Sequence, residues 1–126
     1  MEGLETITKV EEPFIFFELR GSGNATHLGL FSLYSAHVVD GPAATGVGIF
    51  MFTAANGDTL TATFTGAATP IPNTQNQELT IVEYAVITGG TGRFAGARGT
   101  FRVERVFSFV TFLTHGSFDG TIILAR

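Results

Sequence analysis

A strict alternation of threonine with apolar residues constrains the fold of this chain more than any other feature. In the stretch DTLTATFTGAA, Leu60, Ala62 and Phe64 fall on one side of an extended chain, and threonines fall on the other. This period of two predicts a strand with one buried face. The preceding Asn56-Gly57 pair is typical of a tight hairpin turn. Residues 45–54 and 58–67 are therefore predicted to pair as antiparallel strands.

Strand patterns also dominate the rest of the chain. Further candidates, rich in Val, Ile, Phe and Thr, are residues 14–20, 26–39, 78–88, 98–112 and 116–124. Turns are predicted at GSGN, DGPAA, TPIPNTQNQ and THGS, and the best helical candidate is one short turn near residues 91–95. Seven or eight strands in so small a domain predict an all-β sandwich or a closed barrel. Closure is favoured because it removes exposed strand edges.

The charge distribution divides the chain into two parts. Residues 1–12 carry four Glu and one Lys and are set apart as an acidic N-terminal segment, whereas residues 13–126 are assigned to a single domain. That domain has six Arg and seven acidic residues, so it offers neither the basic surface that nucleic acid needs nor a basic helix for a membrane surface. The absence of cysteine removes disulfides and thiolate chemistry. Localisation stays open between the cytoplasm and secretion after removal of a signal peptide.

The chain carries more apolar surface than one core can hide. Hydrophobic residues make up 44% of it and charged residues 14%, where about a quarter is usual for soluble domains. Two predicted strands, FIFFELR and HLGLFSLYSAHVV, are apolar on both faces. One face can fill the interior, so the other needs a cover. We therefore expect a homo-trimer or a homo-dimer.

A glycine-rich run, ITGGTGRFAGARGTF, fits the G-x-G-x-x-A form of a dinucleotide-binding loop at residues 90–95. That function needs a helix directly after the loop and an acidic residue further on. Here Gly96 and Gly99 follow, then a strand pattern, and no acidic residue lies near position 110. The run is therefore predicted to be a tight corner at residues 89–97 between two strands, with no bound nucleotide or other cofactor.

The same glycine run supports a family resemblance. GGTGRFAGARGTF resembles the GGTGRF corner of plant dirigent proteins and of small bacterial proteins related to the allene oxide cyclase barrel. The order of GNATHLGLF, GVGIFMFTAANGDTL and GSFDGTI also fits, so the resemblance covers about residues 20–122. It implies a closed antiparallel eight-stranded β-barrel with an apolar cavity, in dimers or trimers. It also implies cofactor-free ring closure, isomerisation or radical coupling of hydrophobic molecules, but it transfers no catalytic residue by motif.

Two charged residues stand on faces that are otherwise apolar. Glu83 shares its strand face with Leu79, Ile81, Ala85 and Ile87, so in a barrel lumen it could act as an acid or a base; the alternative is a surface glutamate. Arg105, between Val103 and Phe107, could pair with Glu83 or hold a substrate carboxylate, or its stem could cover phenylalanines at a subunit contact. The distance between Glu83 and Arg105 decides whether the carboxylate can transfer protons.

Other candidates are less constrained by their surroundings. Tyr84 and His27 are further catalytic candidates, as a phenol donor and as an acid or base at a barrel mouth. His27 and His37 are about 33 Å apart along one strand, and His115 is placed in a turn, so no metal site is predicted. Glu18 and Arg20 are expected to pair at the rim. The candidate ligand-binding residues are Phe16, Glu18, Phe31, Tyr34, Phe52, Phe101 and Phe107.

Two classes of function remain. The first is a cofactor-free cyclase or isomerase that acts on a hydrophobic small molecule in an apolar cavity. The second is a non-catalytic protein that binds a hydrophobic ligand or guides its coupling. An enzyme needs Glu83 or Arg105 to point into the cavity beside a tyrosine or a histidine, whereas a carrier needs only the cavity.

Overall fold

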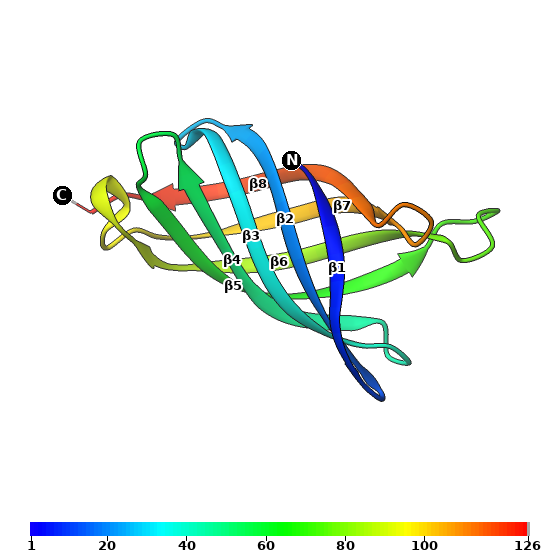
Figure 1. Cartoon of the computed structure of the whole chain (residues 1–126). Coiled ribbons are helices and arrows are strands. Elements are labelled where there is room, and N and C mark those ends of the chain that lie inside the picture. The colour runs from blue at the N-terminus through cyan, green and yellow to red at the C-terminus, as the bar shows by residue number, and fades with distance from the viewer. Residues whose placement is uncertain (126) are drawn as a thin grey trace.

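The computed structural model describes residues 1–125, which form one closed barrel of eight antiparallel strands (Figure 1). Each strand pairs with its neighbours in the sequence, and β1 returns to pair with β8. The predicted fold class is confirmed. The elements are β1 (Glu2–Glu11), β2 (Phe14–Ala25), β3 (Gly29–Asp40), β4 (Thr45–Ala54), β5 (Thr59–Pro70), β6 (Glu78–Gly90), the short 3-10 helix η1 (Gly92–Phe94), β7 (Arg98–Ser108) and β8 (Leu113–Ile123).

The two ends of the barrel differ in their connections. One end, called the corner end, carries the turns 26–28 and 55–58 and the glycine corner 91–97, and it lies at the left and top of Figure 1. The other, called the loop end, carries the connections 12–13, 41–44, 71–77 and 109–112. Each end therefore has its own set of residues around the barrel mouth.

Phenylalanine rings fill much of the interior. Leu60, Ala62 and Phe64 point inward from β5 as their alternation predicts, and each is at most 4% exposed. Phe50 from β4 is 1% exposed, and its ring stacks on that of Phe64 with centroids 4.3 Å apart. The same ring contacts those of Phe52, Phe101 and Phe118. The middle of the barrel is thus a packed core rather than one open chamber.

The N-terminal segment is part of the barrel, so the predicted boundary at residue 13 is wrong. Residues 2–11 form β1, which pairs with β2 along its length and with β8 at its beginning. The β1–β8 seam has the register pairs Glu2–His115, Gly3–Thr114 and Leu4–Leu113, extended by a hydrogen bond from the Glu5 amide to the Phe112 carbonyl. The acidic composition was misleading because most of these glutamates face solvent, whereas Glu5 is only 4% exposed.

Two predicted turns lie inside strands. GSGN belongs to β2, and THGS, which contains His115, belongs to β8. The chain reverses instead at residues 26–28 and 109–112. Small polar residues and glycines in these stretches mimic turn composition, but Gly21 and Gly116 lie where the neighbouring strand leaves no room for a Cβ atom.

The glycine corner connects β6 to β7 in a tight turn, as predicted. The short helical turn expected near residues 91–95 is present as η1, and β7 follows it without a longer helix. Phe94 is fully buried, and the Arg93 amide donates a hydrogen bond to Oδ2 of Asp58 on the β4–β5 turn at 3.3 Å. The corner thereby fixes two connections at this end. Within residues 1–125, no helix has the length and apolar character needed to cross a bilayer.

Candidate functional site

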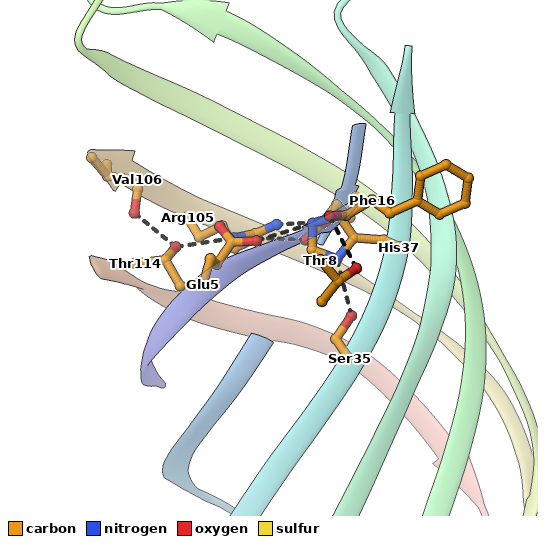
Figure 2. A network of polar contacts seen from close by, with 9 residues as sticks. Glu5, Thr8, Phe16, Ser35, His37, Arg105, Val106 and Thr114 are labelled. Atoms are coloured by element: carbon orange, nitrogen blue, oxygen red, sulfur yellow. Dashed lines mark hydrogen bonds and ion pairs between the residues drawn. The ribbon is translucent and has the colours of Figure 1, made fainter. Parts of the chain in front are cut away.

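An ion-paired network crosses the barrel interior toward the loop end, with Arg105 on β7 at its centre (Figure 2). Arg105 donates from Nε and Nη2 to the two carboxylate oxygens of Glu83 on β6, at 2.9 and 3.0 Å. Its Nη1 donates to Oε2 of Glu5 on β1 at 2.9 Å and to Oγ1 of Thr114 on β8 at 3.1 Å. One guanidinium therefore joins four strands.

A histidine extends this network to β3. Nε2 of His37 lies 3.0 Å from Oε1 of Glu5, and Nδ1 lies 3.4 Å from Oγ of Ser35. The imidazole stacks on the ring of Phe17, with centroids 5.3 Å apart and planes 11° apart. Stacking fixes the plane of the imidazole, so its nitrogen atoms have defined directions. Together, six side chains form what we call the polar cluster: Glu5, Ser35, His37, Glu83, Arg105 and Thr114.

Glycines on neighbouring strands make room for three members of the cluster. His37 is paired in register with Gly48, Glu83 with Gly66, and Arg105 with Gly116. A Cβ atom at Gly66 would come 2.6 Å from Cγ of Glu83. The long polar side chains can therefore lie across their neighbouring strands only because glycine stands opposite each of them.

The cluster is buried, so its charges depend on one another. Burial by itself would lower the pKa of Arg105, but the charges and hydrogen bonds of Glu83 and Glu5 outweigh it and raise the pKa above its ordinary value. Burial would raise the pKa of Glu5, but the contacts with His37 and Arg105 outweigh it and lower the pKa. Arg105 and Glu5 are therefore both charged near neutral pH.

Two separate hollows lie at the two ends of the barrel. The corner-end pocket, of about 220 Å³, has the aromatic side chains Phe31, Phe52, Phe101 and Phe118 in its wall, with His27 and Asp119 among its polar residues. The loop-end cavity, of about 70 Å³, is bordered by the charged members of the polar cluster. No residue lines both. The stacked rings of Phe50 and Phe64 lie between the aromatic pocket and His37.

The predicted catalytic candidates do not come together at one site. Glu83 and Arg105 face inward, are 2% and 3% exposed, and pair directly. His27 lies in the turn at the opposite end, and Tyr84 points away from the lumen with 62% of its surface exposed. Glu83 and Tyr84 are adjacent on one strand, so their side chains necessarily point to opposite faces.

The predicted ligand-binding residues also divide. Phe31, Phe52 and Phe101 line the corner-end pocket, and Phe107 lines the loop-end cavity. By contrast, Phe16, Glu18 and Tyr34 lie on the outer wall and line neither hollow.

The outward position of Phe16, Glu18 and Tyr34 has a physical reason. In β2, Phe17 and Leu19 face inward and are buried. Glu18 lies between them in the sequence, so its side chain faces outward and contacts water. Glu18 lies 3.6 Å from Arg20, whose guanidinium covers the ring of Tyr34. The expected Glu18–Arg20 pair therefore forms, but on the outer wall instead of the rim.

Sequence reasoning missed four members of the polar cluster: Glu5, Ser35, His37 and Thr114. A signal for two of them was present, because Ser35 and His37 share the strand parity of Phe31 and Leu33, which are buried. The glycines opposite His37, Glu83 and Arg105 were a second signal. Glu5 had none, since the acidic sequence of β1 shows no apolar alternation.

Within residues 1–125, no three His, Asp or Glu side chains are grouped so that they could hold a metal ion. No model of a protein family, no curated protein and no solved structure matches the chain. The resemblance to the allene oxide cyclase and dirigent barrels therefore stays a prediction beyond the eight-stranded architecture.

Proposed function

We propose that the barrel binds a small hydrophobic molecule in the corner-end pocket and does not transform it. The observation that carries this proposal is the pocket's wall of four phenylalanines beside an opening with a few polar groups. Ligand sites in proteins are usually apolar hollows of this kind, although about 300 Å³ or more is typical. A volume of about 220 Å³ favours a compact ligand with one or two rings.

The wall of the pocket is well suited to flat, apolar molecules. Phe52 meets Phe31 and Phe118 edge to face, with ring centroids 5.2 and 5.3 Å apart. Phe101 meets Phe118 in the same way at 5.7 Å. Such packing holds the rings in place before a ligand arrives, so little side-chain order has to be gained on binding. His27 and Asp119 at the opening offer polar contacts to one end of the ligand.

The experiment is a fluorescence titration with naphthalene, a neutral apolar molecule of two fused rings. We expect saturable binding to the wild-type protein. Ala25→Trp places a large side chain at the pocket and should weaken binding at least tenfold, because Ala25 lines it. Ala36→Trp is the matched control, since Ala36 is on the outward face of β3 and lines neither hollow. Equal affinity in the wild type and Ala25→Trp would refute the assignment of this pocket.

A cofactor-free cyclase or isomerase is the second candidate. Glu83 and Arg105 beside His37 at the loop-end cavity favour it, because this places ionisable groups against a hollow. The pairing of both Glu83 oxygens with Arg105 weighs against Glu83 as a base. Mass spectrometry can identify a molecule that co-purifies with the native protein. When this molecule is then incubated with the protein, a carrier leaves it unchanged, whereas an enzyme converts it.

A further inference from the structure

The loop-end cavity contains a buried hydrogen-bond acceptor that has no aligned donor. Oε1 of Glu5 is the one buried side-chain nitrogen or oxygen without a hydrogen-bond partner among residues 1–125. The Glu5 side chain is 3% exposed, and the residue borders the cavity. An unsatisfied buried acceptor is costly, especially on a charged group. Because this acceptor lies beside a cavity, a molecule bound in the cavity could supply the missing hydrogen-bond donor.

A donor lies directly beside this acceptor. Nε2 of His37 is 3.0 Å from Oε1 of Glu5, but the two are not aligned as a hydrogen bond. A nitrogen lone pair facing a carboxylate would be repelled, so Nε2 carries a proton. Ser35 can maintain this arrangement by donating its hydroxyl proton to Nδ1 at 3.4 Å. The two groups attract each other, but their contact is not an aligned hydrogen bond, so the donor and the acceptor can both bind a third group in the cavity.

We propose that the loop-end cavity binds an uncharged small molecule through a hydroxyl group, as an alcohol or a phenol. The hydroxyl donates its proton to Oε1 of Glu5 and accepts the Nε2 proton of His37, because a hydroxyl is both a donor and an acceptor. An ammonium group only donates, so it leaves His37 unsatisfied. A carboxylate only accepts, and the negative charges of Glu5 and Glu83 repel it.

The rest of the cavity suits the carbon part of such a molecule. Its wall is mostly apolar and includes the side chains Phe64, Leu79, Ile81, Phe107 and Phe109. A volume of about 70 Å³ corresponds to room for about five water molecules, which is comparable to one small ring. This site is separate from the corner-end pocket, so the inference does not rest on the proposed function.

Histidine NMR distinguishes the two sites in one experiment. The chain has three histidines, and His37 borders the loop-end cavity whereas His27 borders the corner-end pocket. Protein with ¹³C-labelled histidine is titrated with phenol and, separately, with toluene, which has the same ring without the hydroxyl. We expect phenol to shift the His37 signals saturably. Toluene should bind there at least tenfold more weakly, because it leaves both polar groups unsatisfied.

A matched pair of variants tests the location. Ala68→Leu fills the cavity from β5 and should abolish the phenol-dependent shift of His37, whereas Ala36→Leu, on the outer face of β3, should leave it unchanged. The inference is overturned if phenol does not shift His37, if toluene shifts it with equal affinity, or if folded Ala68→Leu keeps the shift. Shifts confined to His27 also overturn it, while they support the proposed function. The phenol–toluene comparison uses the wild-type protein, so it holds even if Ala68→Leu does not fold.

Discussion

Arg105 and Glu83 form a two-pronged ion pair in the barrel interior, with Nε to Oε1 at 2.9 Å and Nη2 to Oε2 at 3.0 Å. Both carboxylate oxygens are engaged, so Glu83 serves to position the guanidinium. In this position the guanidinium can donate hydrogen bonds from Nη1 to Glu5 and Thr114. The stability of the barrel should therefore be sensitive to Arg105.

Removing the charge of Arg105 should be strongly destabilising. Arg105→Met leaves Glu83 and Glu5 buried without their counter-charge, and breaking a buried pair in this way costs about 3–5 kcal/mol. The measurement is the free energy of unfolding in urea. Arg102→Met is the control, because Arg102 is on the same strand but pairs with Glu104 at the solvent-exposed surface. Equal losses in the two variants would show that the buried cluster is not a special source of stability.

Acid should destabilise the protein partly through Glu5. The pKa of Glu5 is lowered from its ordinary value of 4.5, so the folded state favours the charged form. This contribution is fully present above pH 4.5 and is lost as the pH falls through the lowered pKa.

Urea unfolding midpoints measured from neutral to acidic pH test this dependence. Below pH 4.5 the wild type should lose stability more steeply than Glu5→Gln. Glu2→Gln controls for the change in net charge, because it removes a carboxylate from the exposed part of β1. Parallel profiles for the wild type and Glu5→Gln would contradict the role of Glu5.

The glycine corner should tolerate substitution less well than the β4–β5 turn. Gly92 and Gly57 both have positive φ, of 59° and 92°, so alanine is strained at either position. A Cβ atom at Gly92 would also collide with the Asp58 carboxylate, whereas a Cβ atom at Gly57 meets nothing within 4 Å.

Thermal unfolding of the two alanine variants isolates this collision. Gly57→Ala should cost about 1–2 kcal/mol, the usual cost of a Cβ atom on left-handed backbone. Gly92→Ala should lower the melting temperature further. A smaller effect at Gly92 than at Gly57 would mean that Asp58 moves aside freely and that the corner is not fixed by this contact.

Self-association is predicted through the outer wall. Val47, Ile49 and Met51 on β4 point outward and are 55%, 45% and 37% exposed. Light scattering at micromolar concentration should give the mass of a dimer or a trimer. Ile49→Lys should shift the population toward the single chain, whereas Thr100→Lys, on the polar outer face of β7, should not. A wild-type protein with the mass of one chain would refute the prediction.

The fold was more predictable than the site because the two depend on different information. The alternation around Phe64 fixes which face of β5 is buried, and the glycine corner fixes where β6 ends and β7 begins. For β2 the same reasoning failed. Both faces of FIFFELR are apolar, so the alternation does not show which face points into the barrel. The burial of Phe17 rather than Phe16 depends on neighbours across the barrel.

Only two of the six members of the polar cluster were predictable, for a related reason. Glu83 and Arg105 stand out as charges among apolar neighbours on their own strands, so local sequence reveals them. Glu5 is recognised only through Arg105, which lies far away in the sequence. A network that spans five strands is visible only after the barrel has closed.

The β1–β8 seam has a consequence for folding. Glu5 and Arg105 are 100 positions apart, and their hydrogen bond lies next to a seam of only a few register pairs. Contacts between distant segments are formed late, because a long loop must first be ordered. The edge of β1 opposite β2 therefore stays unpaired until β8 is in place, and a strand of a second chain can pair with it during that interval. Refolding yield should consequently fall with protein concentration, and the last hydrogen bonds to become protected from exchange should be those of this seam.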